Sequence, residues 1–330
     1  MSVERLLVIR YSALGDVVLA TSVIEPLLRR FPGARIEWVT SHAAAPLLEG
    51  LPGIAAVHRL GRSGEDGPRA LARRLRGRFD VAIDLQEKVK SRYLALVAAP
   101  RRLLYRRRTR WQALCALFGR DRPLQRAHAT ALYAEVLRPL GVEGPGRPAI
   151  AIPAAARDRA RALLAGSSRP LVGVAPGATW ATKRWAPERF AAVADALHEA
   201  GHGLVLVAGP GDAATVAAFR AALRSPLHAD LTPLPVDALA AALAELKLLI
   251  ACDSGPVHLA SAQGIPALVL FGPTSTVRWA PPPPGRALSL GLACQPCSNH
   301  GGERCPLGHH DCLQHLEVEA VLVAARELLA

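Results

Sequence analysis

Short apolar runs recur along the chain, and each is followed by a longer stretch whose apolar residues recur at helical spacing. An unbroken apolar run is typical of a parallel strand that is buried on both faces of its sheet. The candidate strands of this kind lie at residues 6–9, 81–83, 171–174, 204–207, 248–250 and 267–270, and residues 36–39, which include Glu37, look like a further strand. Because strands that alternate with amphipathic helices form βαβ units, the sequence predicts an α/β fold with parallel sheets.

The candidate strands form two sets, one in each half of the chain. Residues 143–148 are the stretch richest in glycine and proline before the second set begins, as expected for a domain boundary. We therefore predict two Rossmann-like domains, at residues 1–150 and 151–315. Residues 316–330 read as a terminal helix, and a return of this helix to the N-terminal domain is one option.

The excess positive charge is confined to the first half. The chain has 330 residues and a net charge of +13, and its 51% hydrophobic and 20% charged residues exclude a disordered protein. Residues 1–150 contain 26 Lys and Arg against 13 Asp and Glu, whereas residues 151–330 contain 14 of each. An Arg-rich composition explains the total charge but not this asymmetry, which indicates that the first domain faces an anionic partner.

The N-terminus does not resemble a secretory signal, because Glu4, Arg5 and Arg10 interrupt its apolar residues. No uncharged run approaches the roughly 20 apolar residues that span a bilayer. We therefore expect a cytoplasmic protein that can touch a membrane surface.

Three segments lie where strands lead into helices, the place at which doubly wound sheets bind ligands. In the first, residues 12–16, Gly15 permits a close turn and Asp16 begins a helix. Asp16 is either a first-turn acid that stabilises the helix by up to ~1 kcal/mol or a general base on the rim of an interdomain cleft.

The other two segments suit an anion. Residues 176–185 lack the spacing of a Walker A loop, but their small residues, hydroxyls and adjacent cations suit a diphosphate. Residues 253–260 read as a helix start whose free N–H groups attract an anion, and His258 lies one turn into that helix. The alternatives are solvated loop charges in the first segment and an ordinary helix start with a packed histidine in the second.

Taken together, these segments resemble glycosyltransferase family 9, the lipopolysaccharide heptosyltransferases. The resemblance is carried by Ser-x-Leu-Gly-Asp-Val at 12–17, Thr-Lys-Arg-Trp at 182–185, Asp-Ser-Gly-Pro-x-His-Leu-Ala at 253–260 and Leu-Phe-Gly-Pro-Thr at 270–274. It covers nearly the whole chain. This sequence departs from the commoner wording at Ser254, where threonine is usual, and at Ala186, and neither change removes a functional group.

The resemblance implies a GT-B fold, in which two Rossmann-like domains face each other across a cleft. The N-terminal domain then takes the acceptor, a Kdo-bearing or heptosylated lipid A core, and the C-terminal domain takes ADP-L-glycero-D-manno-heptose. The family inverts the anomeric configuration and requires no divalent metal for transfer. It implies an enzyme at the cytoplasmic surface of the inner membrane, associated peripherally.

The resemblance also assigns roles to residues. Asp16 matches the proposed catalytic base, and Gly15 and Lys90 match acceptor-binding positions. The donor-binding positions are matched by Thr179, Lys183, Asp253, Ser254, Gly255 and His258.

Four cysteines near the C-terminus form a separate pattern, Cys294-x2-Cys297-x7-Cys305-x6-Cys312, with histidines between them. The first pair has the spacing of a zinc site, but the second pair does not. A structural metal at these four cysteines, reduced thiols packed in a loop, and a disulfide or redox pair are all open.

Functions of other classes are disfavoured. The basic stretch 101–110 suggests nucleic-acid binding, but aromatic residues make up only 5% of the chain and no nucleic-acid module is recognisable. An NAD-dependent oxidoreductase would need Gly-x-Gly-x-x-Gly after residues 6–9, which is absent. We expect no nucleic-acid partner. We read the basic stretches 69–78 and 101–110 as facing the anionic acceptor or membrane. A family 9 enzyme with another donor or acceptor stays open, as do the heptosyl position and the oligomeric state.

Overall fold

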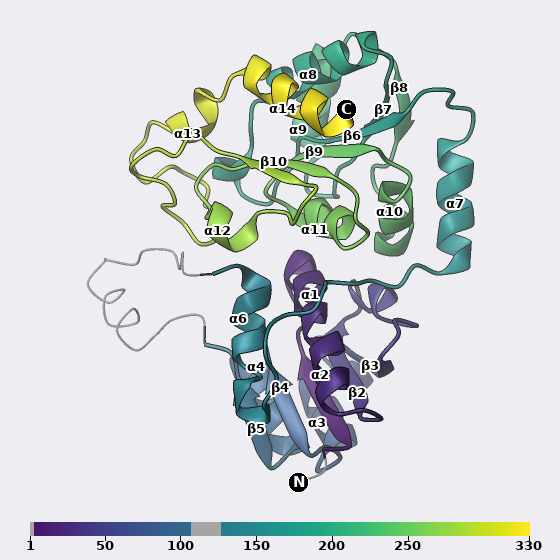
Figure 1. Cartoon of the computed structure of the whole chain (residues 1–330), viewed down its shortest axis with the longest axis vertical. Helices are drawn as coiled ribbons and strands as arrows, with labels where there is room; N and C mark the ends of the chain where they lie inside the picture. Colours follow the sequence, from purple (N-terminus) through teal and green to yellow (C-terminus); the bar gives the residue numbers. More distant parts are fainter. Residues whose placement is uncertain (1–2, 107–126) are drawn as a thin grey trace. The chain divides into compact units, whose positions relative to one another are not determined.

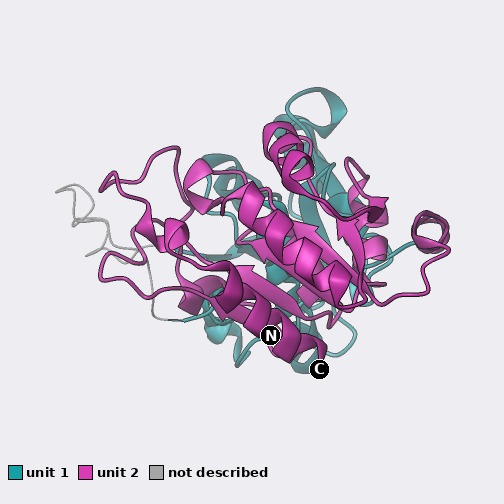
Figure 2. Cartoon of the chain, turned by 90° about the horizontal axis from the view of Figure 1, so that it is seen from above, with its two compact units in different colours: residues 1–111, 127–153 teal, residues 112–126, 154–330 magenta. Residues whose placement is uncertain are grey.

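The computed structural model describes residues 3–106 and 127–330. These residues form two compact units (Figure 2), unit 1 with residues 3–106 and 127–153 and unit 2 with residues 154–330. The basic stretch 101–110 lies partly outside the described residues.

Unit 1, as far as it is described, contains a parallel sheet with the strand order β3-β2-β1-β4-β5 (Figure 1). The strands are β1 (Arg5–Ile9), β2 (Arg35–Ser41), β3 (Ile54–Leu60), β4 (Val81–Asp84) and β5 (Arg101–Leu104). The helices are α1 (Leu14–Ala20), α2 (Ile24–Arg30), α3 (Pro68–Leu75), α4 (Val89–Ala98) and α6 (Ala129–Glu135). Short 3-10 turns are η1 (Thr21–Val23), η2 (Ala45–Leu47), η3 (Gly64–Asp66) and η4 (Arg138–Leu140).

The apolar runs of unit 1 fold as strands because helices cover them. Leu7 and Ile9 of β1 pack in one buried cluster with Leu71 and Leu75 of α3 and with Leu94 of α4. Since β1 and β4 are neighbours in the sheet, the loops that follow them lie side by side at its carboxyl edge.

Unit 2 contains a second parallel sheet with the strand order β11-β10-β9-β6-β7-β8. The strands are β6 (Leu171–Ala175), β7 (Gly203–Leu206), β8 (Leu227–Asp230), β9 (Leu248–Cys252), β10 (Ala267–Leu270) and β11 (Arg286–Leu288). The helices are α7 (Ala154–Leu164), α8 (Pro187–Glu199), α9 (Ala213–Ala222), α10 (Val236–Leu243), α11 (Gly255–Ser261), α12 (Thr276–Trp279), α13 (Asp311–Gln314) and α14 (Val318–Leu329), with the 3-10 turn η5 (Ala181–Lys183).

The terminal helix α14 packs on the sheet of unit 2. Val321 and Ala325 of α14 share a buried cluster with Phe190 of α8 and with Ile250 and Leu270 of β9 and β10. The helix begins at Val318, two residues later than expected. Part of its apolar face is therefore buried in the core of unit 2.

Four strands carry no clear signal in the sequence: β3, β5, β8 and β11. These four are the edge strands of the two described sheets. Three of them, β5, β8 and β11, mix polar with apolar residues. An edge or poorly covered strand has no need for an unbroken apolar run. Within the described ranges, no helix has the length and hydropathy needed to cross a membrane.

Candidate active site

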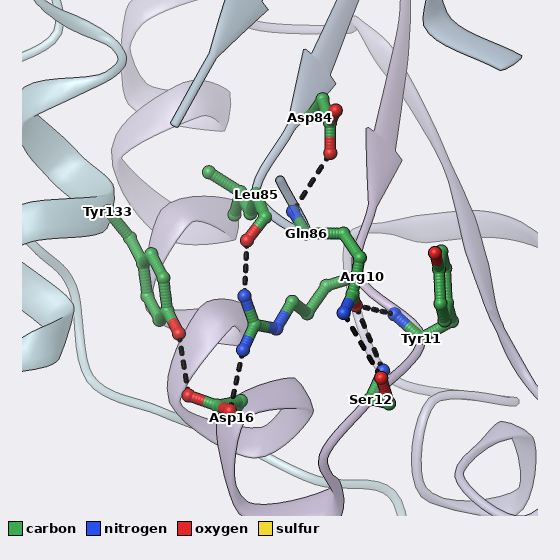
Figure 3. A network of polar contacts seen from close by, with 8 residues as sticks. All are labelled: Arg10, Tyr11, Ser12, Asp16, Asp84, Leu85, Gln86 and Tyr133. Atoms are coloured by element: carbon green, nitrogen blue, oxygen red, sulfur yellow. Dashed lines mark hydrogen bonds and ion pairs between the residues drawn. The ribbon is translucent and has the colours of Figure 1, made fainter. Parts of the chain in front are cut away.

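Asp16 lies at the carboxyl edge of the unit 1 sheet. It is the third residue of α1, which starts five residues after β1 ends. Its Oδ2 lies 2.6 Å from Nη2 of Arg10, and its Oδ1 accepts a hydrogen bond of 2.9 Å from the hydroxyl of Tyr133 (Figure 3). Both carboxylate oxygens are therefore fixed by side chains that come from β1's end and from α6.

Arg10 is a buried cation, with only 3% of the residue exposed. A guanidinium at this depth needs partners, and it finds Asp16 and the backbone carbonyl of Leu85, to which Nη1 donates (Figure 3). Burial lowers the pKa of Arg10, but Tyr133 and Asp16 outweigh it, and the net pKa is raised. Arg10 thus carries its charge permanently beside Asp16.

Tyr133 is held as a neutral donor. Its ring is buried and packs edge-on to Tyr105, with 5.3 Å between ring centroids, and the Arg10 guanidinium lies 5.5 Å from its centre. Burial raises the pKa of the Tyr133 hydroxyl well above its ordinary value; Arg10 opposes this shift and Asp16 adds to it. The hydroxyl therefore keeps its proton, which it donates to Asp16.

Gln86 ties the loop before α1 to the loop before α4. Its Oε1 accepts hydrogen bonds from the backbone N–H groups of Tyr11 and Ser12, and its Nε2 donates to the Ser12 hydroxyl (Figure 3). Asp84, at the end of β4, accepts in turn from the Gln86 N–H and from the hydroxyl of Ser91. These hydrogen bonds thus fix the loop that leads into α1 and Asp16 to the segment that follows the neighbouring strand β4.

The two predicted acceptor positions differ in burial and in their distance along the chain from Asp16. Gly15 is buried in α1 beside Asp16. Lys90 is exposed in the first turn of α4, outside the hydrogen-bonded network around Asp16, and lines a cavity with Arg62, Arg69 and Tyr93.

A second cluster lies at the carboxyl edge of the unit 2 sheet. The strands β10, β9 and β6 are consecutive there, and Thr274, Asp253 and Lys183 follow them. Asp253 Oδ2 lies 2.8 Å from Lys183 Nζ and accepts a hydrogen bond of 2.7 Å from Thr274 Oγ1. Lys183, Asp253 and Thr274 are called the Asp253 cluster below.

The carboxyl group of Asp253 is buried yet ionised. Burial raises its pKa, but Lys183, Thr274 and His258 together outweigh burial and lower the pKa below its ordinary value. His258 is itself buried in α11 and faces the Trp279 ring, with 6.3 Å between centroids. The cluster is a preorganised pair of opposite charges.

The remaining predicted donor positions surround this cluster along the chain. Ser254 precedes α11 and its hydroxyl donates to the Cys252 carbonyl, while Gly255 is the first residue of that helix. Thr179 is exposed in the loop between β6 and η5.

Arg10, Tyr133 and Thr274 were not predicted as site residues. Arg10 ends an apolar run and Thr274 ends the Leu-Phe-Gly-Pro-Thr segment, so both had a weak signal. Tyr133 had none, because it lies 117 residues from Asp16.

The structure gives no support for a metal site in the cysteine segment, as far as its residues are described. The described cysteines are free thiols, and among residues 3–106 and 127–330 no group of three or more His, Cys, Asp or Glu is placed to hold a metal ion. The structural metal considered for Cys294, Cys297, Cys305 and Cys312 is therefore unsupported. Burial, with the nearby Cys297, Cys294 and Cys305, raises the pKa of Cys312 to about 11. Burial also raises the pKa of Cys305, but backbone N–H groups of residues 307–310 outweigh it and lower the pKa.

Comparison with known proteins gives one consistent result. The family model of glycosyltransferase family 9 (heptosyltransferase) matches residues 68–308. Lipopolysaccharide heptosyltransferase 3 of Escherichia coli is 29% identical over 293 residues, which cover 81% of this chain and 83% of the relative.

Solved structures agree. The glycosyl transferase family 9 protein from Veillonella parvula superposes with a TM-score of 0.84 at 25% identity, covering 100% of this chain and 98% of that one. The E. coli heptosyltransferase WaaC with ADP-2-deoxy-2-fluoro heptose superposes with a TM-score of 0.70 at 20% identity, covering 98% and 99%. The expected fold class, GT-B with two α/β units built on parallel sheets, is confirmed.

Proposed function

This chain belongs to glycosyltransferase family 9 and is a glycosyltransferase, and we propose that it moves L-glycero-D-manno-heptose from ADP-heptose to a hydroxyl of the lipopolysaccharide inner core. The curated relative in E. coli carries the name of a lipopolysaccharide heptosyltransferase, and WaaC is bound to an ADP-heptose analogue. The observation that carries the proposal is the carboxylate of Asp16, held between a buried cation and a neutral phenol.

Asp16 acts as the general base. The acceptor hydroxyl gives its proton to the Asp16 carboxylate while its oxygen bonds to the anomeric carbon, and the bond from that carbon to the diphosphate oxygen breaks. Attack opposite the leaving group inverts the anomeric configuration. The proton ends on Asp16 and the electron pair of the broken bond ends on ADP.

Arg10 and Tyr133 prepare Asp16 for this step. The ion pair and the hydrogen bond fix both oxygens, which holds the carboxylate in one orientation before the acceptor arrives. Neither residue needs to touch the acceptor.

Lys183 stabilises the departing ADP. An ammonium group has three N–H donors, and the pair with Asp253 leaves two for phosphate oxygens. Charge that develops on the diphosphate in an oxocarbenium-like transition state is met by this fixed cation, which is worth about 3 kcal/mol. Thr179, Ser254, Gly255 and His258 complete the donor site, and transfer needs no divalent metal.

The acceptor is anionic and is bound by unit 1. Phosphates and carboxylates of a Kdo-bearing or heptosylated lipid A core match the net charge of residues 1–150. Gly15 lets the acceptor approach α1 and Lys90 contacts an anionic group. The enzyme works at the cytoplasmic face of the inner membrane, to which it associates peripherally.

The test is to incubate the protein with ADP-heptose and a panel of truncated core acceptors, and to identify the product by mass and linkage analysis. One acceptor should gain one heptose with inverted configuration. No turnover with ADP-heptose, combined with turnover of another ADP-sugar, would replace the donor and keep the family.

The variant Asp16→Asn tests the mechanism. It should lower kcat by about 100-fold or more and leave ADP affinity unchanged. The matched control is Asp158→Asn on the surface of α7, where the side chain is 74% exposed, and it should keep wild-type turnover. Turnover of Asp16→Asn within a few-fold of wild type would make Asp16 a first-turn helix acid only.

A further inference from the structure

The outer face of α4 carries apolar side chains that the fold does not use. Val89, Tyr93 and Leu96 are 84%, 42% and 58% exposed, and their spacing of four and three residues puts them on one face of the helix. The opposite face of α4 already contributes Leu94 and Ala95 to the core of unit 1. The exposed face therefore adds nothing to the packing of the unit.

This patch is local. Among the described residues of unit 1, the large exposed apolar side chains are Val89, Tyr93, Leu96 and Leu104. Leu104 belongs to β5, which contacts α4 and pairs with β4, the strand that precedes this helix. All four thus lie on two adjacent elements, and clustering of this kind marks a binding surface rather than scattered surface residues.

Cations surround the patch. Lys88, Lys90 and Arg92 are exposed at the start of α4, and a cavity of about 730 Å³ beside Val89 and Tyr93 has Arg62, Arg69 and Lys90 in its wall and no acidic residue. Arg62 and Arg69 are exposed as well. An apolar stripe flanked by exposed cations is the pattern of an element that lies in a membrane interface.

We propose that this surface, made by Val89, Tyr93, Leu96 and the cations beside them, docks unit 1 on an anionic phospholipid bilayer. The apolar side chains enter the boundary between head groups and acyl chains, and the cavity holds a lipid phosphate between Arg62 and Arg69. The occupant is a bilayer because the surface joins exposed apolar groups to exposed positive charge, and anionic lipids supply the complement to both. The docking is independent of which sugar the enzyme transfers.

The experiment is sedimentation of the full chain with vesicles, without donor or acceptor. Vesicles of phosphatidylcholine with about 30% phosphatidylglycerol should bind the wild-type protein, and vesicles of phosphatidylcholine alone should bind it far less. Salt at about 1 M should weaken the binding, because it screens the surface charges.

Two variants separate the contributions. Val89→Ser with Leu96→Ser should lower vesicle affinity by about 10-fold or more, and Arg62→Gln with Arg69→Gln should lower it by roughly 25-fold, about 5-fold per cation. The control is Leu163→Ser with Val323→Ser, which removes two apolar side chains that are 41% and 45% exposed from α7 and α14 of unit 2 and should bind like wild type.

Each variant is checked for a wild-type melting temperature and wild-type ADP affinity, so that a folding defect is not read as a docking defect. If the wild-type protein does not sediment with anionic vesicles, the proposal is overturned. This holds even if the surface binds a soluble saccharide, a second copy of the chain or another protein. Vesicle affinity that is equal in the Val89/Leu96 variant and in the control also overturns it. The docking rests on the peripheral membrane association in the proposed function, so failure of the vesicle assay removes that association. It leaves the transfer reaction standing, because no sugar is transferred in the assay, and failure of the transfer assay leaves the docking standing.

Discussion

Removal of one partner of the Lys183–Asp253 pair should destabilise unit 2. The two groups are 2.8 Å apart with only 14% and 9% of their side chains exposed. The variant Lys183→Met leaves the Asp253 carboxylate with Thr274 as its remaining partner in the Asp253 cluster. An uncompensated buried charge of this kind costs about 3 kcal/mol. For a unit of this size that is about 6–12 °C in melting temperature.

The double variant Lys183→Met with Asp253→Asn makes the prediction specific. With neither charge present, nothing is left to desolvate, and the double variant should be more stable than Lys183→Met alone, with a coupling energy of about 2 kcal/mol. The measurement is thermal unfolding at pH 7 followed by circular dichroism and calorimetry. The control is Arg161→Met, which breaks an ion pair whose side chains are 67% and 74% exposed and should cost under about 0.5 kcal/mol.

The result that refutes this reasoning is a Lys183→Met protein that melts within about 2 °C of wild type. Asp253 would then be reached by water or protonated, and its pair with Lys183 would be no more than a surface ion pair. A double variant as unstable as the sum of the single variants would mean that packing, rather than charge, explains the loss.

The pKa of Asp253 is lowered in the folded protein, so the stability that its carboxylate contributes is present above the ordinary pKa and is lost as the pH falls through the lowered folded value. Wild type should therefore lose more stability than Asp253→Asn on acidification below about pH 4. Equal losses of stability in the two proteins would contradict this prediction. A Cβ at Gly177 would lie 2.2 Å from the Asp212 carboxyl carbon. Gly177→Ala should therefore displace that carboxylate from the Gly209 N–H that it binds and lower the melting temperature by several degrees. The control Gly211→Ala, where a Cβ meets open space, should not lower it. Cys305, with its lowered pKa, should be alkylated by iodoacetamide at pH 7.5 well before Cys312, whose pKa is about 11, and mass spectrometry that finds Cys312 labelled first would contradict this order.

The sequence predicted the strands that helices bury from both sides. Runs such as 171–174 and 248–250 contain no polar residue because β6 and β9 are central strands. The hydrophobic pattern did not predict β5 and β11, because they are edge strands and carry Arg101, Arg102 and Arg286. Hydrophobic patterning detects buried strands, so it does not predict a strand that is only half covered.

The candidate site divides in the same way. Asp16, Lys183 and Asp253 follow strands that the pattern identified, so the loop rule for parallel sheets found them. The partners of Asp16 were not found, because Tyr133 approaches from α6 and Arg10 looks like an ordinary charge at a strand end. Sequence adjacency places a residue at an edge of the sheet, whereas the partner that fixes it depends on packing between distant elements.

The position of the Asp253 cluster has a consequence for how unit 2 opens. Its three residues follow β6, β9 and β10, which are the middle of the sheet rather than its margins. A ligand that contacts Lys183 and Asp253 binds only when these three strands are paired, so its binding free energy is added to the cost of separating them. Amide hydrogen exchange should therefore slow most in β6, β9 and β10 when the donor site is filled, and least in the edge strands β8 and β11.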